Sequence, residues 1–230
     1  MNRITASILA ATALFLSPPA MAGVIVIPGA TGGDFSLKIT SLKEARFKET
    51  IRQRYDFSCG SAALATLLTY HYRDPVDETE AFKAMYDAGD QKKIRKDGFS
   101  LLDIKNFLQK RGYRADGFRA PLEKLAQLGI PAIVLIEQDG YRHFVVVKGM
   151  NDREVLLGDP SQGARRLSRE RFETLWNGLF FLIRDKREIA VTHFNRDEEW
   201  RIHANAPLAM ALSPSELANV TWLLPGSRDF

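Results

Sequence analysis

The chain has 230 residues, 45% of them hydrophobic, and 32 lysines and arginines against 28 aspartates and glutamates give a formal net charge of +4. A balance this mild argues against binding to nucleic acid or to a membrane surface, and the length suits one domain with a real hydrophobic core. The single cysteine, Cys59, excludes an internal disulfide.

Residues 1–22 have the pattern of a secretory signal peptide. Arg3 precedes an uncharged, mostly apolar run over 4–16, and Ala20-Met21-Ala22 has the small-x-small pattern that signal peptidase cleaves. The run is shorter than the roughly 20 residues that a membrane-spanning helix needs. We therefore expect cleavage after Ala22, export to a bacterial periplasm and no stable membrane anchor.

The next stretch, residues 23–40, is predicted to be a flexible lead-in because it is rich in glycine and other small residues. It contains Gly32-Gly33, and two adjacent glycines are an ordinary feature of a flexible, glycine-rich linker.

From residue 41 the pattern predicts helices. The run from Cys59 to about Tyr72 is apolar on nearly every side, as in a buried helix. Two further helices are predicted to begin at capping patterns and a short one to end at a glycine; their signals are Asp77 with Glu80, Ser100 with Asp103, and the stretch 121–128 before Gly129. The charged stretch 87–98 is predicted to be a solvated loop.

Beyond residue 129 the pattern becomes extended. Strands are predicted at 130–137, 141–148, 154–157 and 179–183, with a hairpin turn at Asp139-Gly140 and a helix over 168–176. Helices followed by an antiparallel sheet predict an α+β domain over residues 41–185. Residues 186–230 form a C-terminal extension whose structure the pattern does not define.

Cys59 is the first candidate for chemistry. It begins the apolar helix, where free backbone N–H groups favour thiolate over thiol. A buried cysteine can also simply fill space at a helix start. A nucleophilic thiol, however, needs a base and a group that orients the base, and the chain offers both.

His143 and Asp159 are the candidates for base and orienting group. His143 opens a strand, and Asp159 follows 16 residues later at the end of the next strand, so antiparallel pairing can bring the two side by side. An ordinary strand histidine and an Asp-Pro turn are the alternatives. The other histidines, at 71, 193 and 203, lack the spacing of a metal site, and we expect neither a metal nor a cofactor.

These residues, with Gln53 six positions before the cysteine, resemble a known family. The motifs Cys59-Gly60, His143-Phe144 with valines after it, Leu157-Gly-Asp159-Pro and Phe172 to Gly178 are similar to those of the bacteriocin-processing, double-glycine peptidases, over about residues 50–185. That resemblance implies a papain-like fold, with helices packed on an antiparallel sheet. It also implies a catalytic Cys59, His143 and Asp159, with Gln53 as a donor to the oxyanion.

One departure narrows the resemblance. Transporter-fused members usually carry Asp immediately before the cysteine, where this chain has Ser58. The form here is similar to the stand-alone, exported branch, some of whose members accompany functional-amyloid (Fap) secretion systems.

The resemblance implies an exported cysteine peptidase that cuts a peptide or protein, after Gly-Gly, in support of secretion. The substrate would be a secreted amyloid subunit or a Gly-Gly leader peptide, and Gly32-Gly33 would be a candidate for self-processing. Two alternatives stay open: a catalytically idle peptide-binding module, and an acyl or peptidyl transferase that uses the same site.

Overall fold

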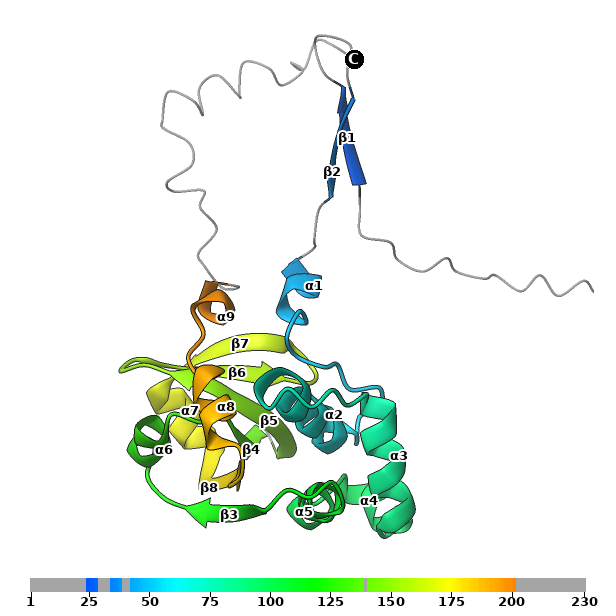
Figure 1. The fold of residues 1–230 in the computed structure, drawn as a ribbon, viewed down its shortest axis with the longest axis vertical. Helices are drawn as coiled ribbons and strands as arrows, with labels where there is room; N and C mark the ends of the chain where they lie inside the picture. The colour runs from blue at the N-terminus through cyan, green and yellow to red at the C-terminus, as the bar shows by residue number, and fades with distance from the viewer. Residues whose placement is uncertain (1–23, 29–33, 39–41, 139, 202–230) are drawn as a thin grey trace, which may run out of the picture. The chain divides into compact units, whose positions relative to one another are not determined.

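The computed structural model describes residues 24–28, 34–38, 42–138 and 140–201 (Figure 1). The predicted signal peptide and Gly32-Gly33 lie outside these ranges. Within the segment predicted as a lead-in, strands β1 (Val24–Pro28) and β2 (Asp34–Lys38) pair as an antiparallel hairpin. The chain divides into two compact units, and the second begins at Leu42.

The second unit combines helices with one sheet. Its helices are α1 (Leu42–Arg46), α2 (Cys59–Thr66) with the π-helical turn η1 (Leu67–His71), α3 (Glu78–Ala88), α4 (Gln91–Asp97), α5 (Leu101–Lys110), α6 (Leu122–Leu128), α7 (Arg169–Leu175), α8 (Arg187–Thr192) and α9 (Asp197–Arg201). Its strands are β3 (Ala115–Arg119), β4 (Ala132–Gln138), β5 (Tyr141–Met150), β6 (Glu154–Asp159), β7 (Gly163–Ser168) and β8 (Trp176–Ile183).

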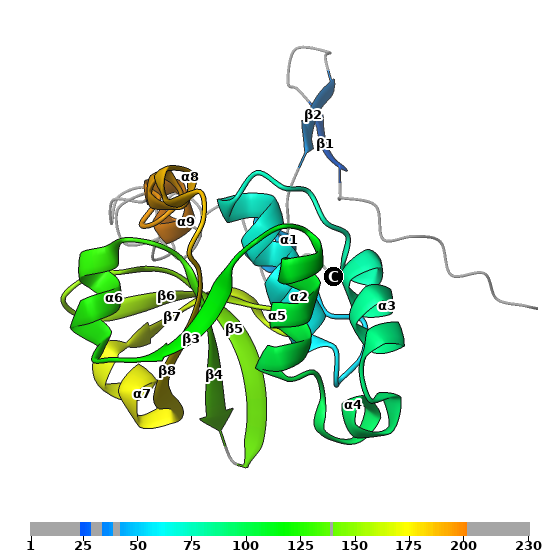
Figure 2. The same ribbon diagram turned by 60° about the horizontal axis from the view of Figure 1, so that its bottom comes forward.

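The six strands form an antiparallel sheet in the order β3-β8-β4-β5-β6-β7. Helices α2 to α5 gather on one side of the sheet, and α6 and α7 lie away from them (Figure 2). The α+β prediction is confirmed. The central strand β5 contacts α2, so the element that begins with Cys59 lies directly against the element that carries His143.

Helix α2 is buried at every one of its eight residues. Its alanines and leucines leave no polar face, and it packs against both β5 and α3. Gly60 permits a close approach here, because a Cβ at this position would lie 2.9 Å from the Cβ of Phe99. The start of α2 is therefore held between packed neighbours, which fixes the position of Cys59.

Several local predictions need correction. The charged stretch 87–98 contains α4, which begins where Asp90 accepts hydrogen bonds from the backbone of Lys92 and Lys93 and ends at Gly98, whose φ is +78°. Only Ile94 of this helix is buried, so its apolar pattern was too weak to reveal it. By contrast, the predicted cap of α5 is present, with Ser100 and Asp103 bonded to each other in both directions.

The structure also contains a strand that was not predicted, and the boundary between α7 and β8 differs from the prediction. Strand β7 was not predicted, because Arg165 and Arg166 make this edge strand unusually polar. The helix predicted over 168–176 ends at Leu175, and Gly178 lies inside β8 with a φ of +81°. This part of β8 pairs with β4 across a shift in register, which explains why a glycine interrupts a strand here.

Residues 187–201, part of the predicted C-terminal extension, form α8 and α9 on this unit. Lys148 of β5 is completely buried, and its Nζ lies 2.7 Å from Glu199 of α9 and donates to the backbone oxygen of Glu49 at 2.7 Å. Asn195, between the two helices, accepts from the backbone N–H of Met150. We call residues 187–201 the C-terminal strap.

No helix in the described part of the chain is both long and apolar enough to cross a membrane.

Candidate active site

Cys59 is the first residue of α2 and is buried, with 5% of its surface exposed. Ser58 precedes the helix but does not cap it, because its hydroxyl bonds to the backbone of Tyr55 instead. The first amide of this helix to bond within it belongs to Ala62, which donates to the Ser58 oxygen at 3.2 Å. The earlier N–H groups, including that of Cys59, are therefore left for another acceptor.

His143 and Asp159 meet as the strand pattern predicts. Strands β5 and β6 pair so that Val146 lies opposite Gly158, which places Asp159 near the start of β5. The Nε2 atom of His143 lies 2.7 Å from Oδ1 of Asp159, and both side chains are buried. The other ring nitrogen, Nδ1, is buried without a conventional hydrogen-bond partner among the described residues.

The charge state of His143 depends on two neighbours. Burial lowers the pKa of His143, but interactions with the Asp159 carboxylate and the Cys59 side chain outweigh that effect and raise it to about 9. The ring is therefore an imidazolium at neutral pH. It lies between a carboxylate on its Nε2 side and the sulfur that begins α2.

Asp159 has more partners than His143 alone. Its Oδ1 accepts from the Ser161 hydroxyl at 2.7 Å and from the backbone N–H groups of Ser161 and Gln162, while Arg165 Nε lies 2.9 Å from its Oδ2. Burial raises the pKa of Asp159, but the hydrogen bond and charge of His143, with Ser161 and Arg165, hold it well below its usual range. This carboxylate stays ionised and fixes the tautomer and orientation of the ring.

Gln53 lies in the loop that leads to Cys59. Its backbone N–H donates to the Pro160 oxygen at 3.0 Å, which ties this loop to the turn after Asp159. Its side-chain Nε2 donates to the backbone oxygens of Tyr55 and Asp56 at 3.0 and 3.3 Å, and its Oε1 is buried without a partner among the described residues. In this structure the amide therefore holds the loop in shape.

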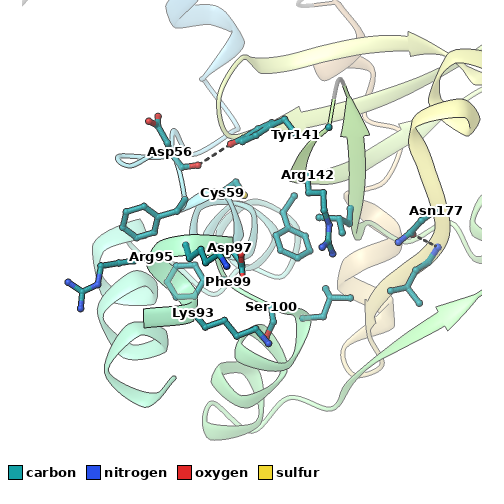
Figure 3. Close-up of a pocket in the computed structure, with 18 residues that line it drawn as sticks. Asp56, Cys59, Lys93, Arg95, Asp97, Phe99, Ser100, Tyr141, Arg142 and Asn177 are labelled. Atoms are coloured by element: carbon teal, nitrogen blue, oxygen red, sulfur yellow. Dashed lines mark hydrogen bonds between the residues drawn. The ribbon is translucent and has the colours of Figure 1, made fainter. Parts of the chain in front are cut away.

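A groove of about 770 Å³ opens beside Cys59 (Figure 3). Apolar side chains from the loop before α2 and from strands β4 and β5 line it, among them Phe57, Leu135 and Phe144. Helix α4 contributes Lys93 and Lys96. A groove lined by apolar side chains and by more basic than acidic groups suits an extended peptide.

Tyr141 lines this groove together with the cysteine. Its hydroxyl donates to the backbone oxygen of Asp56 at 3.0 Å, the hydrogen bond drawn in Figure 3. Its ring stacks on that of His143, with centroids 5.7 Å apart and planes at 27°. This hydrogen bond connects the loop before Cys59 to the start of β5 at the border of the groove.

Sequence reasoning did not identify Tyr141, Ser161 or Arg165 as part of this site. A signal existed for Tyr141, since residues two apart on a strand share a face and Tyr141 precedes His143 by two. A serine two residues after an aspartate is a turn pattern, which pointed to Ser161. Arg165 could not be found, because it reaches Asp159 only through the pairing of β6 with the unpredicted β7.

The remaining histidines lie elsewhere. His71 is buried, and its Nδ1 lies 3.0 Å from the backbone oxygen of His193. His203 is outside the described residues. No group of three or more His, Cys, Asp or Glu side chains in the described ranges is arranged to hold a metal ion.

Comparisons with known proteins find related sequences and a similar fold. Residues 48–188 match the Peptidase C39 family. The chain is 41% identical over 184 residues to the "Probable functional amyloid protease FapD" of Pseudomonas fluorescens, covering 80% of each chain, and 41% identical over 161 residues to that of Pseudomonas aeruginosa, covering 70% of each. A solved structure, the peptidase domain of the Streptococcus ABC transporter ComA, superposes with a TM-score of 0.51 at 25% identity, over 59% of this chain and 96% of that domain.

Proposed function

This chain belongs to the Peptidase C39 family, and from that premise we propose that it cleaves peptides with Cys59 as nucleophile, His143 as proton carrier and Asp159 as the group that orients the ring. The observation that carries the proposal is the position of the His143 ring, between the Asp159 carboxylate and the Cys59 sulfur. A raised pKa on the imidazole keeps its proton available, and an imidazolium beside a thiol favours the thiolate.

The proton then moves in a balanced cycle. The Cys59 thiolate attacks the peptide carbonyl, and the His143 imidazolium gives its proton to the leaving amine. Water attacks the resulting thioester, the neutral imidazole takes a proton from that water, and the acyl product leaves as a carboxylic acid. Asp159 keeps its charge throughout, because its donors hold its pKa low.

Two donors would stabilise the oxyanion. The first is the backbone N–H of Cys59, which receives no partner from within its own helix. The second is the Gln53 amide, which the structure shows bonded to the Tyr55 and Asp56 oxygens. The role we assign to Gln53 therefore requires one of these hydrogen bonds to open when substrate binds.

We assign cleavage after Gly-Gly on the family resemblance and on the position of Tyr141. Tyr141 lines the groove beside Cys59, and its hydrogen bond to Asp56 holds the ring at the border of the groove, which favours small side chains at the scissile bond. Glycine lets the substrate backbone approach most closely.

We also propose that the protein works in a bacterial periplasm on a protein that is being secreted. The signal-peptide pattern of residues 1–22 supports export, with cleavage after Ala22. The relatives named as probable functional amyloid proteases support a secreted amyloid subunit as the partner, with a Gly-Gly leader peptide as the second candidate. Intact-mass measurement of protein from the cell envelope tests the first point, since a mature chain should begin at Gly23.

The peptidase proposal is tested with synthetic peptides. The protein without residues 1–22 should cleave a peptide after an internal Gly-Gly and should leave the same peptide with Val-Val uncut. Cys59→Ala should abolish cleavage and keep the circular dichroism spectrum, while His193→Ala is the control outside the site. Full turnover by Cys59→Ala would refute the proposal.

A further inference from the structure

Two hollows meet at Tyr141. The groove described above is lined by Cys59, whereas a second hollow of about 290 Å³ is lined by His143, together with Gln138, Ser161, Gln162 and Arg165. Tyr141 lines both of them. The nucleophile and the proton carrier thus border different cavities, with one aromatic ring between the cavities.

The chemistry of the proposed reaction indicates which part of the substrate each hollow would hold. When a thiolate cuts a peptide, the acyl carbon stays bonded to sulfur, and the amine departs with a proton from the imidazolium. The chain before the scissile bond therefore occupies the groove at Cys59. The chain after the bond leaves past the His143 ring, which borders the second hollow.

The second hollow has a positive lining. Among the described residues that line it, Arg165 and the His143 ring are the only groups that can carry charge near neutral pH, since Tyr141 is a phenol. The Arg165 ion pair with Asp159 uses Nε, and Asp159 itself is completely buried behind the lining. Among the described residues no hydrogen bond or ion pair involves the two Nη groups of Arg165, which lines the hollow together with the exposed Ser161 and Gln162.

Building on the proposed peptidase function, we propose that this hollow is the subsite for the leaving-group side of the substrate, and that Arg165 makes it prefer a carboxylate. The carboxylate is an acidic side chain within the first two residues after the scissile bond, or the chain end of a short substrate. A guanidinium binds a carboxylate in a planar, two-point geometry, which a lysine in the same place cannot reproduce.

The test compares peptides that differ only after the scissile bond. One pair carries Glu or Gln in the first two positions after Gly-Gly and continues beyond them; a second pair ends two residues after the bond, with a free or an amidated C-terminus. For the wild type we expect a kcat/KM about three- to tenfold higher for the peptide with the carboxylate, as a partly exposed ion pair provides. Arg165→Gln should bring that ratio to about one, and Arg165→Lys should keep part of it.

The ratio matters because Arg165 also contacts Asp159. A loss of kcat caused by disturbing Asp159 affects both peptides of a pair equally and cancels in the ratio. Gln162→Lys should raise the preference for the carboxylate, and Gln162→Glu should lower it. Arg171→Gln, on an exposed arginine of α7, and Lys93→Gln, in the groove at Cys59, should leave the ratio unchanged.

The outcomes separate the two proposals. A wild-type protein that cuts none of the peptides overturns the proposed function. If the peptides are cut but Arg165→Gln keeps the wild-type ratio, or the wild type shows no preference, this inference alone is overturned. A preference seen only in the first pair assigns the carboxylate to a side chain, and one seen only in the second pair assigns it to the chain end; either supports the subsite.

Discussion

Strand β5 carries a buried base near each end, and each base faces a buried carboxylate. His143 Nε2 lies 2.7 Å from Asp159 Oδ1, and Lys148 Nζ lies 2.7 Å from Glu199 Oε1. Yet the pairs ionise differently. The pKa of Asp159 is below its usual range and that of His143 is about 9, whereas burial raises the pKa of Glu199 to about 8 and lowers that of Lys148.

The difference comes from what else each carboxylate touches. Burial raises the pKa of both acids, but Asp159 also receives hydrogen bonds from Ser161 and Gln162 and faces Arg165. Glu199 instead shares a hydrogen bond with a second carboxyl group, that of Glu49, which raises its pKa further. A short distance to a base does not make a carboxylate ionised; the remaining donors decide it. The pair with more donors is the one proposed for chemistry, and the other pair joins β5 to the C-terminal strap.

The largest effect should come from removing the base of the reactive pair. His143→Ala deprives the thiol of its proton acceptor and the leaving amine of its donor, so kcat/KM should fall about 10²- to 10⁴-fold. Above pH 9, where the raised pKa of His143 no longer contributes to stability, the free energy of unfolding measured in urea should change much less. Near-normal kcat in His143→Ala would show that another group carries the proton.

Breaking the pair at the other end of β5 should reverse this result. Glu199→Ala removes the carboxyl group that lies 2.7 Å from the buried Lys148 Nζ and leaves this donor short of one partner, so the free energy of unfolding should fall by about 1–3 kcal/mol. Peptide cleavage per folded molecule should stay near normal. Glu198→Ala, one residue earlier on an exposed side chain, is the matched control. Equal stability of the two variants would mean that the buried pair does not hold the strap.

Gln53→Ala tests whether the Gln53 amide stabilises the oxyanion at the proposed active site. An oxyanion donor acts on the transition state, so kcat should fall about 10²- to 10³-fold with little change in KM. If Gln53 only keeps the loop in shape, KM should rise together with the fall in kcat. Steady-state kinetics on the Gly-Gly peptide distinguish these cases.

The smallest effect is on pH dependence. Because the folded-state pKa of His143 is raised to about 9, its contribution to stability is complete below its usual pKa of 6.5 and disappears as the pH rises through 9. The lowered pKa of Asp159 gives a contribution that is complete above its usual 3.8 and is lost in acid. Stability should therefore decline between pH 6.5 and 9, and His143→Gln should flatten that decline.

At the other pair the two shifts oppose each other. A raised pKa on Glu199 lowers stability as the pH rises, whereas a lowered pKa on Lys148 increases it. Between pH 6.5 and 9 the contribution of Glu199 changes only up to its pKa of about 8, whereas that of His143 changes up to about 9. Glu199→Gln should therefore change the slope over this window less than His143→Gln does, as measured by unfolding in urea at several pH values. A larger change for Glu199→Gln would contradict the assignment of charges to the two pairs.

The parts of the fold that depend on local sequence patterns could be predicted. Helix α2 is apolar all round and β5 follows a strong turn signal, so the positions of Cys59 and His143 could be predicted. Asp159 followed from the pairing of neighbouring strands. Such elements need only residues that are close in the chain.

The parts that the sequence did not reveal depend on contacts between distant segments. Strand β7 is polar because its arginines face carboxylates, among them Asp159, that only the folded sheet brings near. Lys148, in the middle of an apolar strand, finds its partner more than 50 residues away on α9. A pattern of hydrophobicity cannot show which distant carboxyl group will lie beside a buried amino group such as that of Lys148.

The C-terminal strap bears on where this peptidase can be cut from its chain. The match to the family model ends at residue 188, within α8, yet the carboxyl group that faces Lys148 comes from residue 199. A protein shortened to the matched segment would keep every residue proposed for catalysis and lose the partner of a fully buried ammonium group. The last residue that the family model matches therefore lies before the last element that Lys148 needs as a partner. A shortened protein intended for crystallisation or for grafting should extend at least to residue 201, the end of α9.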